Sequence, residues 1–120
     1  MDNLIKTPVK VYVLILNYNS SQDTIQYVNC LQGQELVDLN ILIVDNCSPN
    51  NSFELLDKEY KNSRNIEVIK SHRNGGYAYG NNFGLRYLKD KDFDYLLISN
   101  NDIEIADQRL IFKMIKSYCN

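Results

Sequence analysis

Short apolar segments alternate regularly with segments of helical pattern, and this alternation restricts the fold more than any other feature. The apolar segments are residues 11–16, 41–44, 66–69 and 95–99. Segments that are apolar almost throughout are typical of strands covered on both faces, and strands separated by helices usually pair in parallel. The pattern therefore predicts an α/β fold with a mostly parallel sheet and helices on both faces.

Apolar residues at helical spacing occupy the intervals between these strands. The expected helices cover residues 20–33, 51–60, 77–89 and a segment that follows Asp107. Ser20 and Asp23 have the spacing of a helix cap, and Asp107 is a suitable capping residue for the last helix. A short apolar alternation at residues 103–105 predicts a fifth strand.

Polar residues follow each of the first four predicted strands. These strand-end segments are residues 17–19, 45–48, 72–76 and 99–102. Right-handed crossovers place the carboxyl ends of parallel strands at one edge of the sheet, where open α/β sheets bind ligands. Asn, Asp, Ser and Gly are also the ordinary residues of turns, so a set of simple loop caps is the alternative interpretation.

Two carboxylates at strand ends have the chemistry of ligand-binding groups. Asp45 is placed to accept a hydrogen bond from a ligand N–H, with a turn or helix cap as the alternative. Asp102 offers an oxygen ligand to a hard cation such as Mg²⁺ or Mn²⁺, and Asn100 offers a second oxygen, directly or through water. Because one carboxylate binds such an ion weakly, a phosphate-bearing ligand is needed to complete the site. The alternative for Asp102 is a plain turn.

The segment NGGYAYGNNFG brings glycines before and into the third predicted helix. Free N–H groups at the start of a helix favour an anion near Gly75 and Gly76. The segment matches neither the dinucleotide-binding glycine pattern nor the P-loop. Gly80 and Gly84 lie four residues apart on one helix face, and close packing of the helix on the sheet explains them better than ligand contact does.

Composition excludes several classes of protein. The net charge of −2 gives no electrostatic basis for binding nucleic acid. The three cysteines are far apart and the single histidine, His72, is near none of them, so neither a zinc site nor a disulfide framework is expected. The apolar run at residues 11–16 is too short for a signal peptide, and no segment is long enough to span a bilayer. We expect a reducing, cytoplasmic location.

Four segments in order, VYVLILNYNS, ILIVDNCSPNNS, NGGYAYGNNFGL and YLLISNNDIEI, resemble the inverting family-2 glycosyltransferases, whose fold is named GT-A. The resemblance extends over roughly residues 9–110 and is nearest to the rhamnosyltransferase-like members. It implies that the predicted sheet is the Rossmann-like, nucleotide-binding half of the GT-A fold.

The resemblance also assigns roles to individual residues. Those matching nucleotide-sugar-binding positions are Asn17, Tyr18, Asn19, Asp45, Asn46, Asn74, Gly75, Gly76, Asn81, Asn100 and Asn101. Asp45 matches the acid that pairs with the base, usually uracil or thymine. Asn100-Asn101-Asp102 matches the D-x-D metal motif with Asn100 in place of the first Asp, which leaves Asp102 as the carboxylate ligand for Mg²⁺ or Mn²⁺.

The implied reaction moves a sugar from a UDP-, TDP- or GDP-linked donor to a hydroxyl of a saccharide or lipid-linked acceptor, with inversion. A metal stabilises charge on the departing diphosphate, and a general base takes the acceptor proton. No residue matches the family's base, because the positions of Glu104 and Asp107 fit a strand and a helix cap.

We therefore expect residues 1–120 to be one donor-binding domain, a fragment or truncated form of a longer enzyme with peripheral membrane association. Such a chain is expected to bind a nucleotide and to transfer sugar poorly or not at all. A non-catalytic nucleotide-binding or interaction module is the alternative, because the base is missing.

Two other classes fit the sequence less well. A receiver domain needs an acidic pair after its first strand, where this chain has Asn17-Tyr18-Asn19. A dinucleotide-binding enzyme needs a G-x-G-x-x-G segment at the same place, and that segment is absent.

Overall fold

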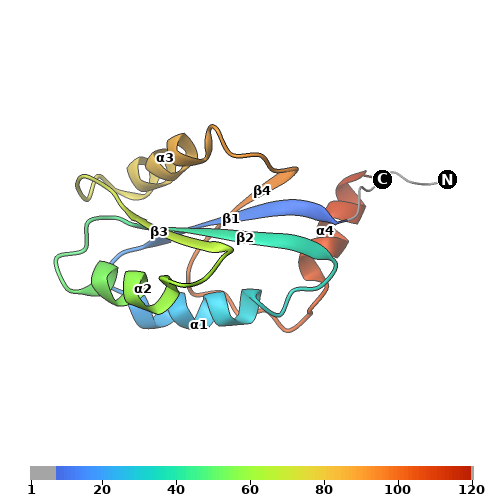
Figure 1. Cartoon of the computed structure of the whole chain (residues 1–120), viewed down its shortest axis with the longest axis horizontal. Helices are drawn as coiled ribbons and strands as arrows, with labels where there is room; N and C mark the ends of the chain where they lie inside the picture. Colours follow the sequence, from blue (N-terminus) through green and yellow to red (C-terminus); the bar gives the residue numbers. More distant parts are fainter. Residues whose placement is uncertain (1–7, 120) are drawn as a thin grey trace.

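In the computed structural model, which describes residues 8–119, strands and helices alternate along the chain (Figure 1). The strands are β1 (Val9–Asn17), β2 (Val37–Asp45), β3 (Ile66–Lys70) and β4 (Tyr95–Ser99). The helices are α1 (Ser21–Leu31), α2 (Ser52–Tyr60), α3 (Tyr77–Leu88) and α4 (Leu110–Cys119). The predicted α/β fold and its four helices are confirmed.

The four strands form one parallel sheet in the order β3-β2-β1-β4. The chain builds the sheet from β1 through β2 to β3, then returns past β1 and adds β4 on the other side. Strand order therefore reverses between β1 and β4, the position at which open α/β sheets bind ligands. The register pairs Asn17 with Asp45 and Ile15 with Ser99, so three strands end close together at this edge.

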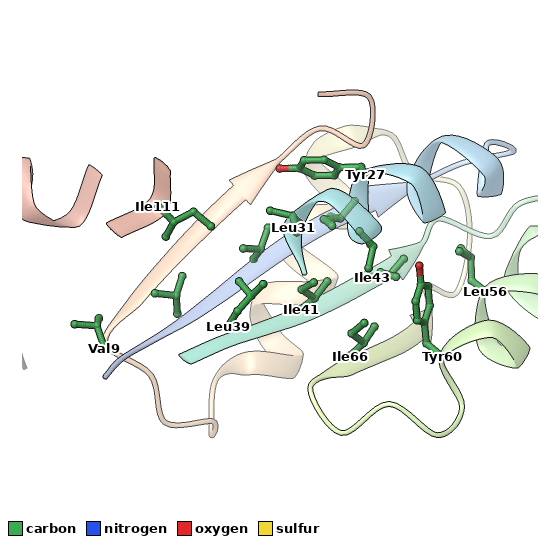
Figure 2. Packing of buried hydrophobic residues seen from close by; sticks show 14 of the residues in the cluster. Val9, Tyr27, Leu31, Leu39, Ile41, Ile43, Leu56, Tyr60, Ile66 and Ile111 are labelled. Atoms are coloured by element: carbon green, nitrogen blue, oxygen red, sulfur yellow. The ribbon is translucent and has the colours of Figure 1, made fainter. Parts of the chain in front are cut away.

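Helices cover both faces of the sheet, which explains why the central runs of β1 and β2, residues 11–16 and 41–44, are apolar at every residue. Val11, Val13 and Ile15 belong to the larger core, whereas Tyr12 and Leu14 belong to the smaller one. Figure 1 shows α3 on one side of the sheet and α1 and α2 on the other. In the larger core, shown in Figure 2, the strands are covered by Tyr27 and Leu31 of α1, Leu56 and Tyr60 of α2, and Ile111 of α4.

The glycines of α3 pack directly on the sheet. A Cβ atom at Gly84 would come within 2.6 Å of Leu14 Cδ1 and 2.9 Å of Val44 Cγ2. A Cβ atom at Gly80 would collide with Leu16 Cδ1. The helix therefore approaches the strands more closely than any larger residue permits, and the packing role predicted for both glycines is confirmed.

The structure corrects two sequence expectations. Residues 103–105 form no strand, because the segment leaves the sheet after Ser99 and only Ile105 packs against the larger core, while Ile103 is 41% exposed. Ser20 precedes α1 but its side chain makes no capping bond among the described residues, since its hydroxyl is engaged with Asn101. Within residues 8–119, no helix is both long enough and apolar enough to cross a membrane.

Candidate functional site

The carboxyl ends of β1 and β2 are joined around one buried carboxylate. Asp45, the last residue of β2, has no solvent exposure. Its Oδ1 accepts from Asn17 Nδ2 at 2.9 Å and from Ser48 Oγ at 2.7 Å, and its Oδ2 accepts from the Ser48 N–H at 2.9 Å. These donors replace the water that a carboxylate loses on burial. Asp45 therefore fixes the end of β1 and the loop after β2 relative to each other.

Left-handed backbone shapes the loops that follow these two strands. Asn19 has φ 56° and Cys47 has φ 58°, a region that residues other than glycine rarely adopt. The Asn19 N–H donates to Ser48 Oγ at 2.9 Å, which ties one loop to the other. Tyr18 lies between Asn17, which is bonded to Asp45, and Asn19, which is bonded to Ser48. It is 41% exposed, so an aromatic ring is available at the surface of the site.

Asn46 connects the end of β2 to the loop before α3. Its Nδ2 donates to Asn74 Oδ1 at 3.2 Å and to the Gly76 carbonyl at 3.0 Å, and its Oδ1 accepts from Ser71 Oγ at 2.9 Å. Gly76 has φ 91°, which favours glycine. The Asn46 amide thus holds the start of α3 at the edge of the sheet beside Asp45. The first N–H groups of that helix have no acceptor within the helix itself.

Two features of α3 and its preceding loop are suited to ligand contact. The Arg73 guanidinium stacks over the Tyr79 ring, 4.4 Å from its centroid, and so holds a cation beside Gly75 and Gly76. Asn81 is 7% exposed, and its Oδ1 has no hydrogen-bond partner among the described residues. An unpartnered buried carbonyl costs about 1–3 kcal/mol. A hydrogen-bond donor on a bound ligand would remove that cost.

The segment after β4 is bonded to α1 and, through it, to β1. Asn101 Nδ2 donates to Ser20 Oγ at 2.8 Å and to Thr24 Oγ1 at 2.9 Å. Thr24 Oγ1 donates to Asn17 Oδ1 at 2.6 Å. The structure therefore brings predicted residues from all four strand ends to one edge. Their side chains form two networks, one that joins Asn17, Asp45 and Asn101 through Thr24 and one that joins Asn46 to Asn74, and backbone bonds connect the two.

The predicted cation ligands Asn100 and Asp102 lie exposed at the end of this segment. Asp102 borders a hollow of about 210 Å³ between α1 and residues 101–104, to which Asp23 and Glu104 also contribute. Within residues 8–119, no group of three or more His, Cys, Asp and Glu residues is arranged to hold a metal ion. One carboxylate and an amide oxygen fit a hard divalent cation only where a bound ligand supplies further oxygens.

Two hydroxyl residues of these networks, Thr24 and Ser71, were not identified from the sequence. Ser48 lies in a predicted strand-end segment, and Ser20 was predicted only as a helix cap. Thr24 has a detectable signal, because it shares the buried face of α1 with Tyr27, Val28 and Leu31. A hydroxyl on an apolar, buried helix face needs a hydrogen-bond partner, which marks the position as part of a polar junction.

The two carboxylates considered as general bases have different surroundings. The Asp107 carboxylate accepts from the Arg109 N–H at 2.9 Å and from Lys113 Nζ at 2.8 Å, just before α4, as expected for a capping residue. Its bond to Lys113 lowers the pKa of the Asp107 carboxyl, which weakens it as a base. Glu104 is exposed beside the hollow that Asp102 borders.

Comparisons with known proteins find relatives of similar sequence. The chain is 33% identical over 94 residues to a low-salt glycan biosynthesis hexosyltransferase, Agl10, of Haloferax volcanii, covering 78% of this chain and 28% of that protein. It is 25% identical over 108 residues to a teichoic acid poly(glycerol phosphate) polymerase of Staphylococcus epidermidis, covering 89% of this chain and 15% of that protein. The chain therefore spans less than a third of the length of either relative.

Solved structures share the fold. A mannosyltransferase of Pyrobaculum calidifontis, in complex with GDP-Man and Mn²⁺, aligns with a TM-score of 0.79 at 15% identity, over 93% of this chain and 32% of that one. TarS of S. aureus in complex with UDP aligns with a TM-score of 0.68 at 22% identity, over 89% and 31%. The family model for glycosyl transferase family 2 matches residues 12–120. Because this match covers nearly the whole sequence, the chain belongs to glycosyltransferase family 2.

Proposed function

We propose that this chain is the donor-binding part of a glycosyltransferase that moves a sugar from a nucleotide diphosphate to an acceptor hydroxyl with inversion. The observation that carries the proposal is the bonded pair Asn17–Asp45 at the edge where strand order reverses. The start of α3 lies on one side of this pair and the segment ending in Asp102 lies on the other. An anion-binding helix start and an oxygen ligand for a cation thus flank one polar edge.

The nucleotide is proposed to bind at the ends of β1 and β2. A carboxylate has about four lone-pair sites, and Asp45 uses three of them within the protein. The remaining site suits a single N–H of a base such as uracil, thymine or guanine, and because Asp45 has no solvent exposure this contact requires the surrounding loops to move when the nucleotide binds. Asn17, Asn19 and Asn46 lie at the same strand ends, and the exposed ring of Tyr18 offers a stacking surface.

The diphosphate and sugar are proposed to lie between α3 and the segment after β4. Asn74, Gly75 and Gly76 border the free N–H groups of the helix start, which attract phosphate oxygens. The unpartnered Oδ1 of Asn81 is proposed to accept a hydrogen bond from a hydroxyl of the sugar nucleotide.

Asp102 and Asn100 are proposed to hold a divalent cation, Mg²⁺ or Mn²⁺, with phosphate oxygens completing its ligands. When bound, such a cation offsets negative charge on the departing diphosphate. Asn101 holds the backbone next to Asp102 by its bonds to Ser20 and Thr24. The solved mannosyltransferase with the same fold is in complex with GDP-Man and Mn²⁺, which supports a divalent cation here.

The acceptor hydroxyl must lose a proton as it attacks the anomeric carbon from the face opposite the nucleotide. We propose that the base and the saccharide or lipid-linked acceptor site belong to a part of the enzyme outside these residues. The low pKa of Asp107 supports this proposal, as does the small share of each relative that the chain spans.

Isothermal titration of the chain with UDP, TDP and GDP, with and without Mn²⁺, tests the proposal. We expect one nucleotide to bind each chain, more tightly when Mn²⁺ is present. A folded sample that binds none of the three would overturn the donor-site proposal and favour a non-catalytic interaction module.

A further inference from the structure

Thr24 touches two strand-end segments at once from inside the protein. It lies in the first turn of α1 and has no solvent exposure. Its Oγ1 accepts from Asn101 Nδ2 at 2.9 Å and donates to Asn17 Oδ1 at 2.6 Å. Asn17 Nδ2 in turn donates to Asp45 Oδ1 at 2.9 Å. Four side chains, each from a different segment of the chain, thus form one line across the end of the sheet.

The direction of every bond in this line follows from Asp45. A carboxylate only accepts hydrogen bonds, so Asn17 must present its amide N–H to Asp45 and its carbonyl oxygen to Thr24. The Thr24 hydroxyl must then donate to Asn17, which leaves only its lone pairs for Asn101. All three bonds therefore point from Asn101 toward Asp45, and hydrogen bonds aligned in this way strengthen one another.

We infer that Thr24 is a positioning residue that couples the cation end of the donor site to its nucleotide end. Asn101 directly precedes Asp102, so its bond to Thr24 restrains the backbone that carries the proposed cation ligand. Asn17 directly precedes Tyr18, so the second bond restrains the proposed nucleotide contact. The inference rests on the proposed function and adds that cation and nucleotide binding are linked through one buried hydroxyl.

Ser20 supports the same junction but does not substitute for Thr24. Its Oγ accepts from Asn101 Nδ2 at 2.8 Å, whereas it lies 3.5 Å from Asn17 Oδ1, at the outer limit of a hydrogen bond. Ser20 is also half-buried rather than fully buried. The Ser20 hydroxyl therefore helps to hold Asn101, while the connection to Asn17 depends on Thr24.

Three single variants isolate this hydroxyl. Thr24→Val keeps the side-chain shape and removes the hydroxyl, whereas Thr24→Ser keeps the hydroxyl. Tyr60→Phe is the matched control, because the Tyr60 hydroxyl is buried, has no partner among residues 8–119 and lies outside the network. Each 120-residue protein is titrated with UDP, TDP and GDP, with and without Mn²⁺, and its folding is checked by circular dichroism.

The quantity that tests the inference is the ratio of the nucleotide Kd without Mn²⁺ to the Kd with Mn²⁺. Loss of one hydrogen bond changes an equilibrium by about two- to tenfold, so Thr24→Val is expected to lower the ratio by that factor. Its Mn²⁺-free Kd is expected to change less. Thr24→Ser and Tyr60→Phe are expected to keep the wild-type ratio.

Failure of the inference is distinguishable from failure of the donor site. Wild-type protein that binds no nucleotide overturns both. Suppose that the wild type binds nucleotide in a Mn²⁺-dependent way. The coupling role alone is then overturned if Thr24→Val keeps the wild-type Kd ratio, which includes the case of equal weakening with and without Mn²⁺. If Thr24→Val does not fold, Asn101→Ala removes the same bond, together with the bond from Asn101 to Ser20, from the segment after β4. An unchanged ratio in Asn101→Ala then overturns the inference.

Discussion

The buried carboxylate of Asp45 organises the candidate site at the level of single residues. An ionised carboxylate without solvent exposure is costly unless hydrogen bonds replace its water. Asn17 and Ser48 supply three such bonds from the neighbouring strand end and from the loop itself. The charge of Asp45 therefore orders the loops at the ends of β1 and β2.

Asp102 has the opposite character, because its carboxylate is exposed and its predicted role depends on a bound cation. We predict that Asp102→Ala lowers nucleotide affinity in the presence of Mn²⁺ by about tenfold or more, or ~1.4 kcal/mol. Affinity without Mn²⁺ should stay close to the wild-type value. Calorimetric titration with UDP, TDP and GDP measures both quantities.

The control for this variant is Asp57→Ala, which removes an exposed carboxylate from α2. Both variants have the same change in charge, so a general electrostatic effect would appear in each of them. If Mn²⁺-dependent binding survives in Asp102→Ala, Asp102 is not a cation ligand and residues 99–102 form a plain turn.

The sequence predicted the residues of the site that stand at strand ends and missed those that act from a neighbouring helix. Asn17 and Asp45 follow apolar runs, so the parallel topology alone brings them to one edge. Thr24 acquires its role only because the segment after β4 folds against α1. That contact joins residues far apart in the chain, and no local pattern encodes it. Ser20 was wrongly predicted to cap α1 for a similar reason. The local sequence does not show that the Ser20 hydroxyl contacts Asn101, which lies far away in the chain.

At the level of elements, the close approach of α3 to the sheet depends on its glycines. We predict that Gly84→Ala destabilises the protein by about 1–2 kcal/mol, because overpacking costs about 1–3 kcal/mol and exceeds the gain in helix propensity. The new Cβ atom would meet Leu14 and Val44, both of which are fully buried. Urea denaturation measures the change in the free energy of unfolding.

Gly33→Ala is the matched control, because a Cβ atom there meets only the Cys30 carbonyl oxygen at 3.4 Å. The free energy of unfolding of this variant should equal or slightly exceed the wild-type value. Equal effects of the two substitutions would show that α3 moves away from the sheet at little cost. The packing role inferred for Gly84 would then be wrong.

The wrong prediction of a fifth strand also belongs to the level of elements. Ile103 and Ile105 alternate as strand residues do, but an alternation of three residues does not determine whether a neighbouring strand is available for pairing. In the structure the segment instead runs between β4 and α4, and residues 101–104 border the hollow beside α1. The apolar parts of β1 and β2, residues 11–16 and 41–44, were predicted correctly because burial on both faces leaves a continuous apolar signal. The flanking residues that extend these strands to Val9–Asn17 and Val37–Asp45 were not predicted.

At the level of the whole molecule, the apolar cores hold the polar strand ends in place, and the strand ends form the proposed donor site. The sheet and its helices form two apolar cores that hold the strand ends in register. Asp107 is engaged with Lys113, whereas Asp23 and Glu104 are exposed carboxylates beside the hollow that Asp102 borders. A general base for catalysis within residues 8–119 is therefore sought at Glu104 and Asp23.

We predict that residues 1–120 bind a nucleotide sugar without turning it over at an enzymatic rate. A positioned general base contributes about 10²–10⁴-fold to a rate, and neither Glu104 nor Asp23, both solvent-exposed without a described positioning partner, has that advantage. Chromatography of UDP-, TDP- and GDP-linked sugars incubated with the chain, with and without a saccharide acceptor, measures the nucleotide released. Steady multiple turnover that disappears in Glu104→Gln or in Asp23→Asn but persists in Asp57→Asn would identify that residue as the base and place catalysis within this chain.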